Sequence, residues 1–282
     1  NNFEENERGR ATAIFDSGSY IGTAMSAPLM SFLILNLSWR YAYIVIAVMG
    51  ILWAFIWKHI SKNLYDTNEI TSKVKLSRGN IFACIANRKV LGMSIGFFCY
   101  NYVKNFYLTW FPSYLVSEKG FSILKVGIWG MLPSIAAVFG GLIAGTITDK
   151  MISKGHSKTL SRKLPLCVGL ICSGSIVFAD SVHSGYLAVV LLSFSFAMTI
   201  AASPSIWAIP GDIAPDANLV GTIGGIQNTV SNIAGMVAPI ITGCIIYKTG
   251  GFKTALLVSG IISCIGAFSY IFIVGKLDAI DI

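Results

Sequence analysis

The sequence predicts an all-α membrane protein with eight transmembrane helices, from its composition, its long apolar runs and the placing of its basic residues. The 282 residues are 54% hydrophobic and 12% charged, and the mean hydropathy is +0.69. A typical soluble domain carries about 25% charged residues. The 21 basic and 13 acidic side chains present here are too few to cover a globule in water. The composition therefore excludes a soluble enzyme.

Eight stretches are long and apolar enough to cross a bilayer, whose hydrocarbon of about 30 Å takes about 20 helical residues. They cover residues 11–36, 38–59, 90–117, 121–148, 164–181, 184–210, 218–246 and 251–276. Glycine and proline interrupt several of them, which membrane helices tolerate. The short connections at 37, 118–120 and 181–183 predict antiparallel neighbours, whereas the connections at 60–89 and 149–163 are longer.

Basic residues gather on one side of the predicted helices. Fifteen of the 21 lie on that side, five lie on the other, and Lys104 lies inside a span. The positive-inside rule then places the richer side, with both termini, in the cytoplasm. The richer side holds Arg8, Arg10, Lys58, Lys62, Lys73, Lys75, Arg78, Arg88, Lys89, Lys150, Lys154, Lys158, Arg162, Lys163 and Lys276. Among these, Lys154, Lys158, Arg162 and Lys163 are expected to be solvated loop residues that set the topology.

The net charge of +8 follows from this topology. No arginine-rich stripe or RNA-binding motif accompanies the basic clusters, so no nucleic-acid partner is expected. The six cysteines form no CxxC pair and are expected to be small buried hydrophobic residues. His59, His156 and His183 lie at span ends or in loops, and no HExxH motif occurs. Neither a metal site, a cofactor nor an intramembrane enzyme is therefore expected.

An internal repeat links the first predicted span to the seventh. Met25-Ser26-Ala27-Pro28 overlays Met236-Val237-Ala238-Pro239 at a shift of 211 residues (236 − 25). The interval contains six spans, so the parent protein is expected to have two six-helix halves. Residues 1–59 are then the last two helices of the first half, 60–89 a cytoplasmic linker and 90–282 the second half. Since only two of the six helices of the first half are present, and the chain opens with Asn1 instead of methionine, we expect four further helices upstream.

Short motifs spread along the chain are similar to those of one transporter family. They are Glu7-Arg8-Gly9-Arg10-Ala11 with Ser17-Gly18 and Ala27-Pro28, Trp39-Arg40, FYLTWFPSYLV at 106–116, Gly145-Thr-Ile-Thr-Asp149-Lys150 and Gly224-Gly225-Ile-Gln-Asn228. They resemble the anion:cation symporter branch of the major facilitator superfamily, which includes bacterial transporters of galactonate, glucarate and hexuronates. The resemblance covers nearly the whole chain, as helices five to twelve of a twelve-helix fold.

The resemblance implies a symporter of the bacterial inner membrane that works as a monomer in the lipid bilayer. It would import a small organic anion, a sugar acid such as galactonate, glucarate or a hexuronate, together with a co-transported proton. Two alternatives stay open. In the first, the substrate is an aromatic carboxylate of the phthalate or hydroxyphenylacetate kind. In the second, the chain is a membrane scaffold or sensor that transports nothing.

Lys104 is the sharpest candidate for a binding residue. It lies 14 residues into the third span (104 − 90), about 21 Å along the helix and close to the bilayer midplane. A lysine there costs about 2.5–3.5 kcal/mol, so its side chain should face protein or water. Tyr100, Tyr107 and Phe111 share its helical face and Asn101 lies beside it, which suits a polyhydroxylated carboxylate. The alternative is a lysine that snorkels or pairs with an acid from the helices expected upstream.

Polar residues of other spans are further candidates for the substrate site. Pro204 is expected to break the sixth span and to present Ser205 and Trp207 to a central cavity, although a tryptophan there also suits packing. Asn228 resembles a substrate-contacting position of the sugar-acid transporters, whereas such amides also serve helix packing. Ser19 stands where some galactonate-type relatives carry glutamine.

A gating role is implied for Gly145, Asp149 and Lys150. In the family, the aspartate of this motif faces the N-terminus of the eleventh helix, whose dipole favours an anion and holds the cytoplasmic side shut. Coupling to protons needs an acid inside the membrane. Asp16 is the deepest acid here and is interpreted as a boundary residue. The resemblance places the coupling carboxylates in the first half.

Overall fold

The computed structural model describes residues 7–36, 38–61 and 78–280, and within these ranges it contains helices and no strand. The predicted all-α fold is confirmed. The α-helices are α1 (Arg8–Asn36), α2 (Trp39–Ser61), α3 (Arg78–Ala86), α4 (Arg88–Thr109), α5 (Phe111–Ser117), α6 (Ile123–Trp129), α7 (Met131–Ser153), α8 (Lys158–Ser173), α9 (Gly185–Ala201), α10 (Ser203–Ile213), α11 (Ala217–Thr249) and α12 (Lys253–Phe268). A 3₁₀ segment, η1 (Gly174–Ala179), follows α8, and a π-helical segment, η2 (Ser269–Val274), follows α12.

Each predicted span corresponds to one helix or to two consecutive ones. Among the described residues, seven segments are long and apolar enough to cross a membrane. The segment made of α4 and α5 is not one of these seven. Asn101, Lys104 and Asn105 lower the hydropathy of α4, which indicates a helix that must be sheltered by its neighbours. The linker expected at 60–89 contains α3, and its residues 62–77, with Lys62, Lys73 and Lys75, lie outside the described residues.

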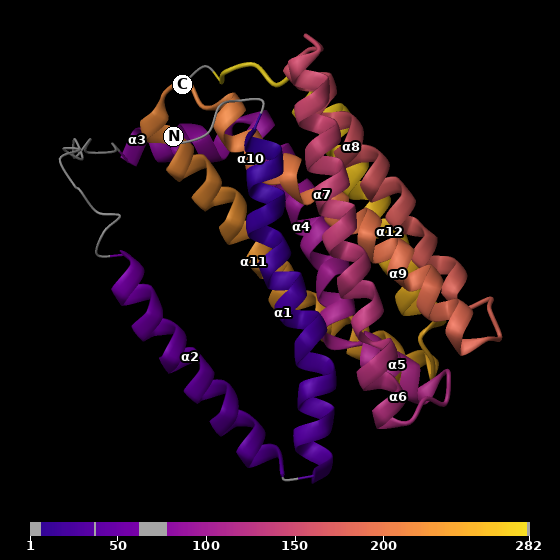
Figure 1. Cartoon of the computed structure of the whole chain (residues 1–282). Coiled ribbons are helices and arrows are strands. Elements are labelled where there is room, and N and C mark those ends of the chain that lie inside the picture. The colour runs from indigo at the N-terminus through magenta and orange to yellow at the C-terminus, as the bar shows by residue number, and fades with distance from the viewer. Residues whose placement is uncertain (1–6, 37, 62–77, 281–282) are drawn as a thin grey trace.

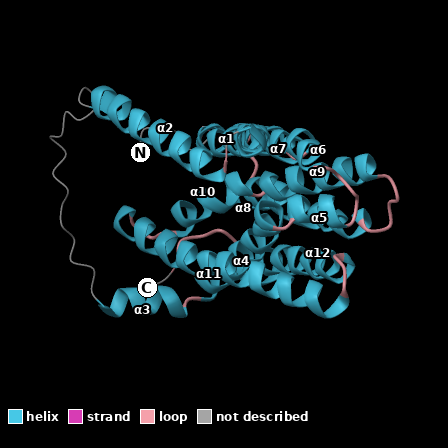
Figure 2. Cartoon of the chain, turned by 90° about the horizontal axis from the view of Figure 1, so that it is seen from below, coloured by secondary structure: helices cyan, strands magenta, loops and turns pink. Residues whose placement is uncertain are grey.

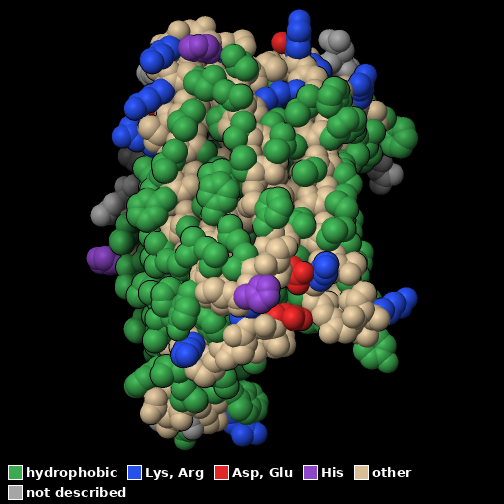
Figure 3. All heavy atoms as spheres, turned by 90° about the vertical axis from the view of Figure 1, so that its right-hand side faces the viewer, with side chains coloured by type: hydrophobic (Ala, Val, Ile, Leu, Met, Phe, Trp, Pro, Cys, Tyr) green, Lys and Arg blue, Asp and Glu red, His purple; other side chains and the backbone are tan. Residues whose placement is uncertain are grey.

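The helices pack as two adjoining rows (Figures 1 and 2). One row has α1 alongside α7, with α9 next to α7, and the other has α11 alongside α4, with α12 behind. Figure 1 shows α2 diverging from α1, and Ala42 is the one buried residue of α2 in the described structure. Apolar side chains cover the middle of the face seen in Figure 3, with charged side chains toward its two ends. This is the pattern of a surface that faces lipid.

Small and hydroxyl side chains hold α8, α9 and α12 together. The hydroxyls of Ser173 and Ser263 are hydrogen-bonded to each other, and Ser263 also donates to the carbonyl oxygen of Leu170 at 2.6 Å. Ser195 of α9 donates to the carbonyl oxygen of Ser173 at 2.6 Å. Such bonds satisfy buried hydroxyls and tie the helices together in a medium without water.

A buried ion pair joins α8 to α10. The Nε of Arg162 donates to Oδ2 of Asp212 at 3.1 Å, and the two side chains are only 1% and 4% exposed. The expectation of a solvated loop was therefore wrong for Arg162. Because α8 begins at Lys158, Arg162 lies one turn inside the helix and points into the bundle.

Residues 275–280 lie across the end of the bundle at which α1 begins (Figure 1). The N–H of Leu277 donates to Oγ1 of Thr159 at 3.0 Å, and the N–H of Ile280 donates to the carbonyl oxygen of Ile213 at 2.9 Å. Both side chains are buried. The C-terminal segment therefore covers the ends of α8 and α10.

Replacing Gly140 by alanine is expected to destabilise the protein. Helices α7 and α9 approach so closely that a Cβ on Gly140 would collide with the carbonyl oxygen of Ala197, at a cost of about 1–3 kcal/mol. Gly141→Ala is the matched control, since its Cβ would lie 3.5 Å from Cγ2 of Ile200, an ordinary contact. The melting temperature in detergent should fall for the first variant only. Equal melting temperatures would contradict the close approach.

Replacing Arg162 by glutamine is expected to remove the guanidinium that binds the buried carboxylate of Asp212. Breaking a buried pair in this way typically costs about 3–5 kcal/mol. Lys154→Gln removes an exposed charge near the start of the same helix and serves as the control. Thermal unfolding followed by size-exclusion chromatography should show a large loss for Arg162→Gln and little change for Lys154→Gln. A loss of similar size in both would argue against the pair.

Candidate substrate-binding site

Lys104 lies in the C-terminal third of α4 and is half-buried. Its Nζ lies 5.6 Å from the ring centroid of Tyr20, a residue of α1. None of the described acidic side chains lies within ion-pair distance of this ammonium. The described part of the chain therefore supplies no acid to pair with Lys104.

The two tyrosines predicted beside Lys104 are packed into the core. Tyr100 is 2% exposed, and its hydroxyl lies 3.3 Å from the hydroxyl of Tyr20. Tyr107 is buried with its ring 4.4 Å from that of Phe196, centroid to centroid. Their hydroxyls thus line the protein interior instead of an open surface, because α9, α11 and α12 all pack around α4.

Asn101 joins α4 to α11. Its Nδ2 donates to the carbonyl oxygen of Ser231 at 2.8 Å, and the residue is half-buried. Asn228 lies on the exposed side of α11, and its carbonyl oxygen accepts a hydrogen bond from Asn232 at 2.8 Å. The side chain amide of Asn101 is thus engaged in helix packing, while Asn228 remains accessible.

The break predicted at Pro204 is present, since α9 ends at Ala201 and α10 begins at Ser203. Ser205 is 1% exposed, and its hydroxyl has no hydrogen-bond partner among the described residues. Trp207 is 43% exposed and lies edge-on to the ring of Phe97, at 5.3 Å and 75°. Ser19 is exposed on α1, and α10 contacts both α1 and α11. Helix α10 thus contacts both of the helices that carry Ser19 and Asn228.

Asp149 binds the start of a different helix from the one that the resemblance implied. Its Oδ2 accepts a hydrogen bond from the backbone N–H of Arg10 at 2.7 Å, in the first turn of α1. Helices α1 and α7 pack along each other, so the end of α7 meets the start of α1, while α11 belongs to the other row (Figure 2). The carboxylate of Asp149 therefore lies at a helix N-terminus, where the helix dipole favours an anion. Gly145 is buried and Lys150 is exposed.

Sequence reasoning missed two residues of α1 that contact the other helices. Asp16 accepts a hydrogen bond from the buried hydroxyl of Ser203 at 2.5 Å, and Tyr20 lies one turn further along. With Ala13, they face residues of α7, α9 and α10 across a closely packed contact. The spacing of 13, 16 and 20 places these residues on one helical face and was a usable signal.

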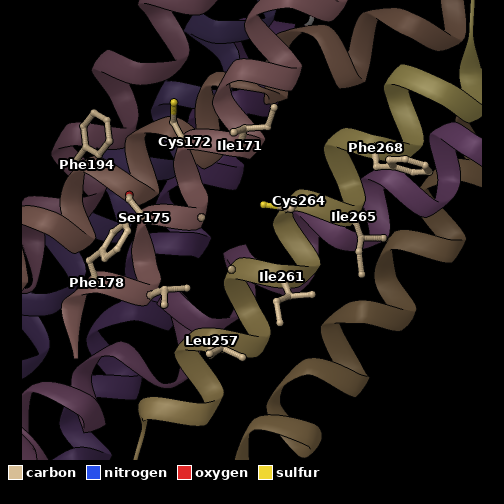
Figure 4. Close-up of a pocket in the computed structure, with 13 residues that line it drawn as sticks. Ile171, Cys172, Ser175, Phe178, Phe194, Leu257, Ile261, Cys264, Ile265 and Phe268 are labelled. Atoms are coloured by element: carbon tan, nitrogen blue, oxygen red, sulfur yellow. The ribbon is translucent and has the colours of Figure 1, made fainter. Parts of the chain in front are cut away.

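A large apolar groove lies apart from Lys104, between α8, η1, α9 and α12. It has a volume of about 840 Å³ and lies on the outer surface of the bundle. Figure 4 shows Phe178 and Phe194 on one side of it and Leu257, Ile261 and Ile265 on the other. This lining suits hydrocarbon and offers no charge to a sugar acid.

The expectation that the cysteines are buried was only partly right. Cys84, Cys99 and Cys167 are buried and Cys172 is half-buried, whereas Cys244 and Cys264 are exposed. Cys172 and Cys264 line the apolar groove on the outer surface of the bundle. A free thiol behaves as a small hydrophobic group, so it suits this apolar surface as well as it suits the interior. In the part of the chain that the structure describes, no three His, Cys, Asp or Glu side chains are grouped to hold a metal ion.

Comparison with known proteins identifies the family. The Major Facilitator Superfamily model matches residues 1–239. A "Probable galactarate/D-glucarate transporter GudP" of Bacillus subtilis (strain 168) is 31% identical over 99% of this chain and 66% of its own length. The "D-galactonate transporter" of Escherichia coli O6:H1 is 31% identical over 99% of this chain and 69% of its own. The "Hexuronate transporter" of Bacillus subtilis (strain 168) is 31% identical over 92% of this chain and 63% of its own length. The chain thus spans about two thirds of the length of these relatives, and it belongs to the Major Facilitator Superfamily.

Proposed function

We propose that this chain is part of a secondary active transporter that imports a sugar acid such as galactonate, glucarate or a hexuronate. The observation that carries the proposal is the half-buried ammonium of Lys104, in the middle of a membrane helix and without an acidic partner among the described residues. A carboxylate of a bound substrate would pair with this ammonium. Relatives named as transporters of such acids support the choice of substrate.

The residues around Lys104 divide the work of binding. Lys104 holds the carboxylate, because an ammonium is a compact charge that pairs well with it. The accessible Asn228, Ser19 and Trp207 receive the hydroxyls and the carbon skeleton, since an amide both donates and accepts hydrogen bonds. Behind them, the buried Tyr100, Tyr107 and Ser205 and the half-buried Asn101 keep the wall in shape.

Transport follows from two sets of helices that rock against each other. Residues 1–59 supply the end of one set, 60–89 link the sets on the cytoplasmic side, and 90–282 form the other. The contact between Asp149 and the first turn of α1, with Gly145 and Lys150 beside it, closes the cytoplasmic side. The protein then works as a monomer in the bacterial inner membrane, with both termini cytoplasmic. It carries no enzyme activity, and protons are co-transported with the anion.

Two other functions remain candidates. The ring of Tyr20 beside Lys104, and the paired rings of Phe97 and Trp207, favour an aromatic carboxylate as the second choice of substrate. A sensor or scaffold would neither transport nor need an unpaired charge at the bilayer midplane.

Lys104→Gln is expected to abolish uptake without loss of protein from the membrane, because glutamine fills the space but removes the charge. The measurement is proton-gradient-driven uptake of labelled sugar acids by proteoliposomes that contain the full-length protein. Lys125→Gln, at an exposed position of α6, is the control and should transport normally. Near-normal uptake by Lys104→Gln would refute the role of the ammonium.

Competition is expected to separate the candidate substrates. Unlabelled galactonate or glucarate should suppress uptake of the labelled sugar acid, and phthalate should leave it unchanged, because a planar ring offers no hydroxyls to Asn228 or Ser19. Melting temperatures measured with each compound extend the test to binding. Stabilisation without uptake would favour the sensor, and suppression by phthalate alone would favour the aromatic carboxylate.

A further inference from the structure

We propose that Tyr20 of α1 belongs to the substrate site, where its ring holds the ammonium of Lys104 in position for the carboxylate. This inference rests on the proposed function, because it needs an anion that binds Lys104. It extends the site beyond α4, α10 and α11 to a helix that contributes only Ser19 otherwise.

The ring of Tyr20 is held in one orientation. The residue is 4% exposed, and its ring meets that of Phe196 edge-to-face, at 6.1 Å and 87°. Its hydroxyl lies 3.3 Å from that of Tyr100. One turn earlier in α1, Asp16 accepts a hydrogen bond from Ser203 at 2.5 Å, which fixes the backbone near Tyr20. The ring is therefore a preformed surface and not a mobile side chain.

The ammonium of Lys104, by contrast, has no other fixed partner in the described structure. Neither an ion pair nor a hydrogen bond holds it among the described residues. Its distance of 5.6 Å from the ring centroid is inside the limit of about 6 Å for a cation–π interaction. Since a charge inside the membrane is costly, the electron-rich face of Tyr20 determines where the long lysine side chain settles.

The pairing has a consequence for the bound state. A carboxylate that reaches Lys104 binds an ammonium whose position is already fixed, so less side-chain entropy is lost on binding. Since Tyr20 and Lys104 lie on α1 and α4, the bound anion would also be attached to both helices. Tyr20 is thus a positioning residue that acts through Lys104.

The test is a series of phenylalanine analogues at position 20 of the full-length protein, with zero, one, two or three fluorine atoms on the ring. Fluorine withdraws electrons from the ring face and changes its size little, so the series weakens the attraction for a cation while it preserves packing. Tyr20→Phe should bind galactonate or glucarate within about twofold of the wild type. The dissociation constant should then rise stepwise with fluorine number, by about tenfold over the series, or about 1.4 kcal/mol.

Tyr102 provides the matched control. It is a buried tyrosine of α4, 1% exposed, packed against Ala234 and Ala238, and no cation lies over its ring in the described part of the chain. The same analogues there should leave the dissociation constant unchanged. A flat series at position 20, with a wild type that binds and a Lys104→Gln variant that does not, would overturn the role of Tyr20 and leave the proposed function intact. A wild type that binds no sugar acid would overturn both.

Discussion

A positive charge in the middle of a membrane helix must be surrounded by protein, water or a ligand, and this requirement shapes the centre of the molecule. Helix α4, which carries Lys104, is contacted by α11, α12, α9 and η2. Its amides are satisfied locally: Asn101 donates to α11 and Asn105 to the carbonyl oxygen of Asn101 at 2.8 Å. Lys104 alone is left facing an aromatic ring. The amides that are satisfied tie α4 to its neighbours, and the ammonium of Lys104 is the group that we propose binds the substrate.

The far side of the bundle shows the complementary use of polar groups. Ser173, Ser195 and Ser263 are buried, and each donates or shares a hydrogen bond between helices. Their hydroxyls replace the hydrophobic driving force that helix association lacks in lipid. The groove beside them is apolar, so this side serves stability and contact with hydrocarbon.

The helices could be predicted from the sequence, because the length of an apolar run and the position of a proline are local properties. All eight predicted spans correspond to helices, seven of them long and apolar enough to cross a membrane, and the break at Pro204 is present. Side-chain partners were not predictable to the same degree, since a helical wheel gives the face of a residue but not what lies opposite. Tyr107 shares a face with Lys104 yet packs against Phe196. The bond between Asp16 and Ser203 joins residues 187 positions apart, beyond the reach of any local pattern.

The partner of Arg162 was also not predictable from the local sequence. Its sequence neighbours are basic and polar, so a solvated loop was the natural interpretation. Only the fold brings Oδ2 of Asp212 to 3.1 Å from Nε of Arg162. The attraction between the two charges then offsets the cost of removing both from water.

Helix α10 is anchored at both ends, by Ser203 to Asp16 and by Asp212 to Arg162. Its 11 residues make a lever about 16 Å long, so a tilt of only about 10° around the Asp212 end would carry Ser203 about 3 Å. That travel exceeds the reach of the hydrogen bond to Asp16. Even a small tilt of α10 would thus break its hydrogen bond to α1 and shift Ser205 and Trp207. The hydrogen bond between Ser203 and Asp16, which is weaker than the ion pair at the other end, would therefore be the first contact to break when α10 moves.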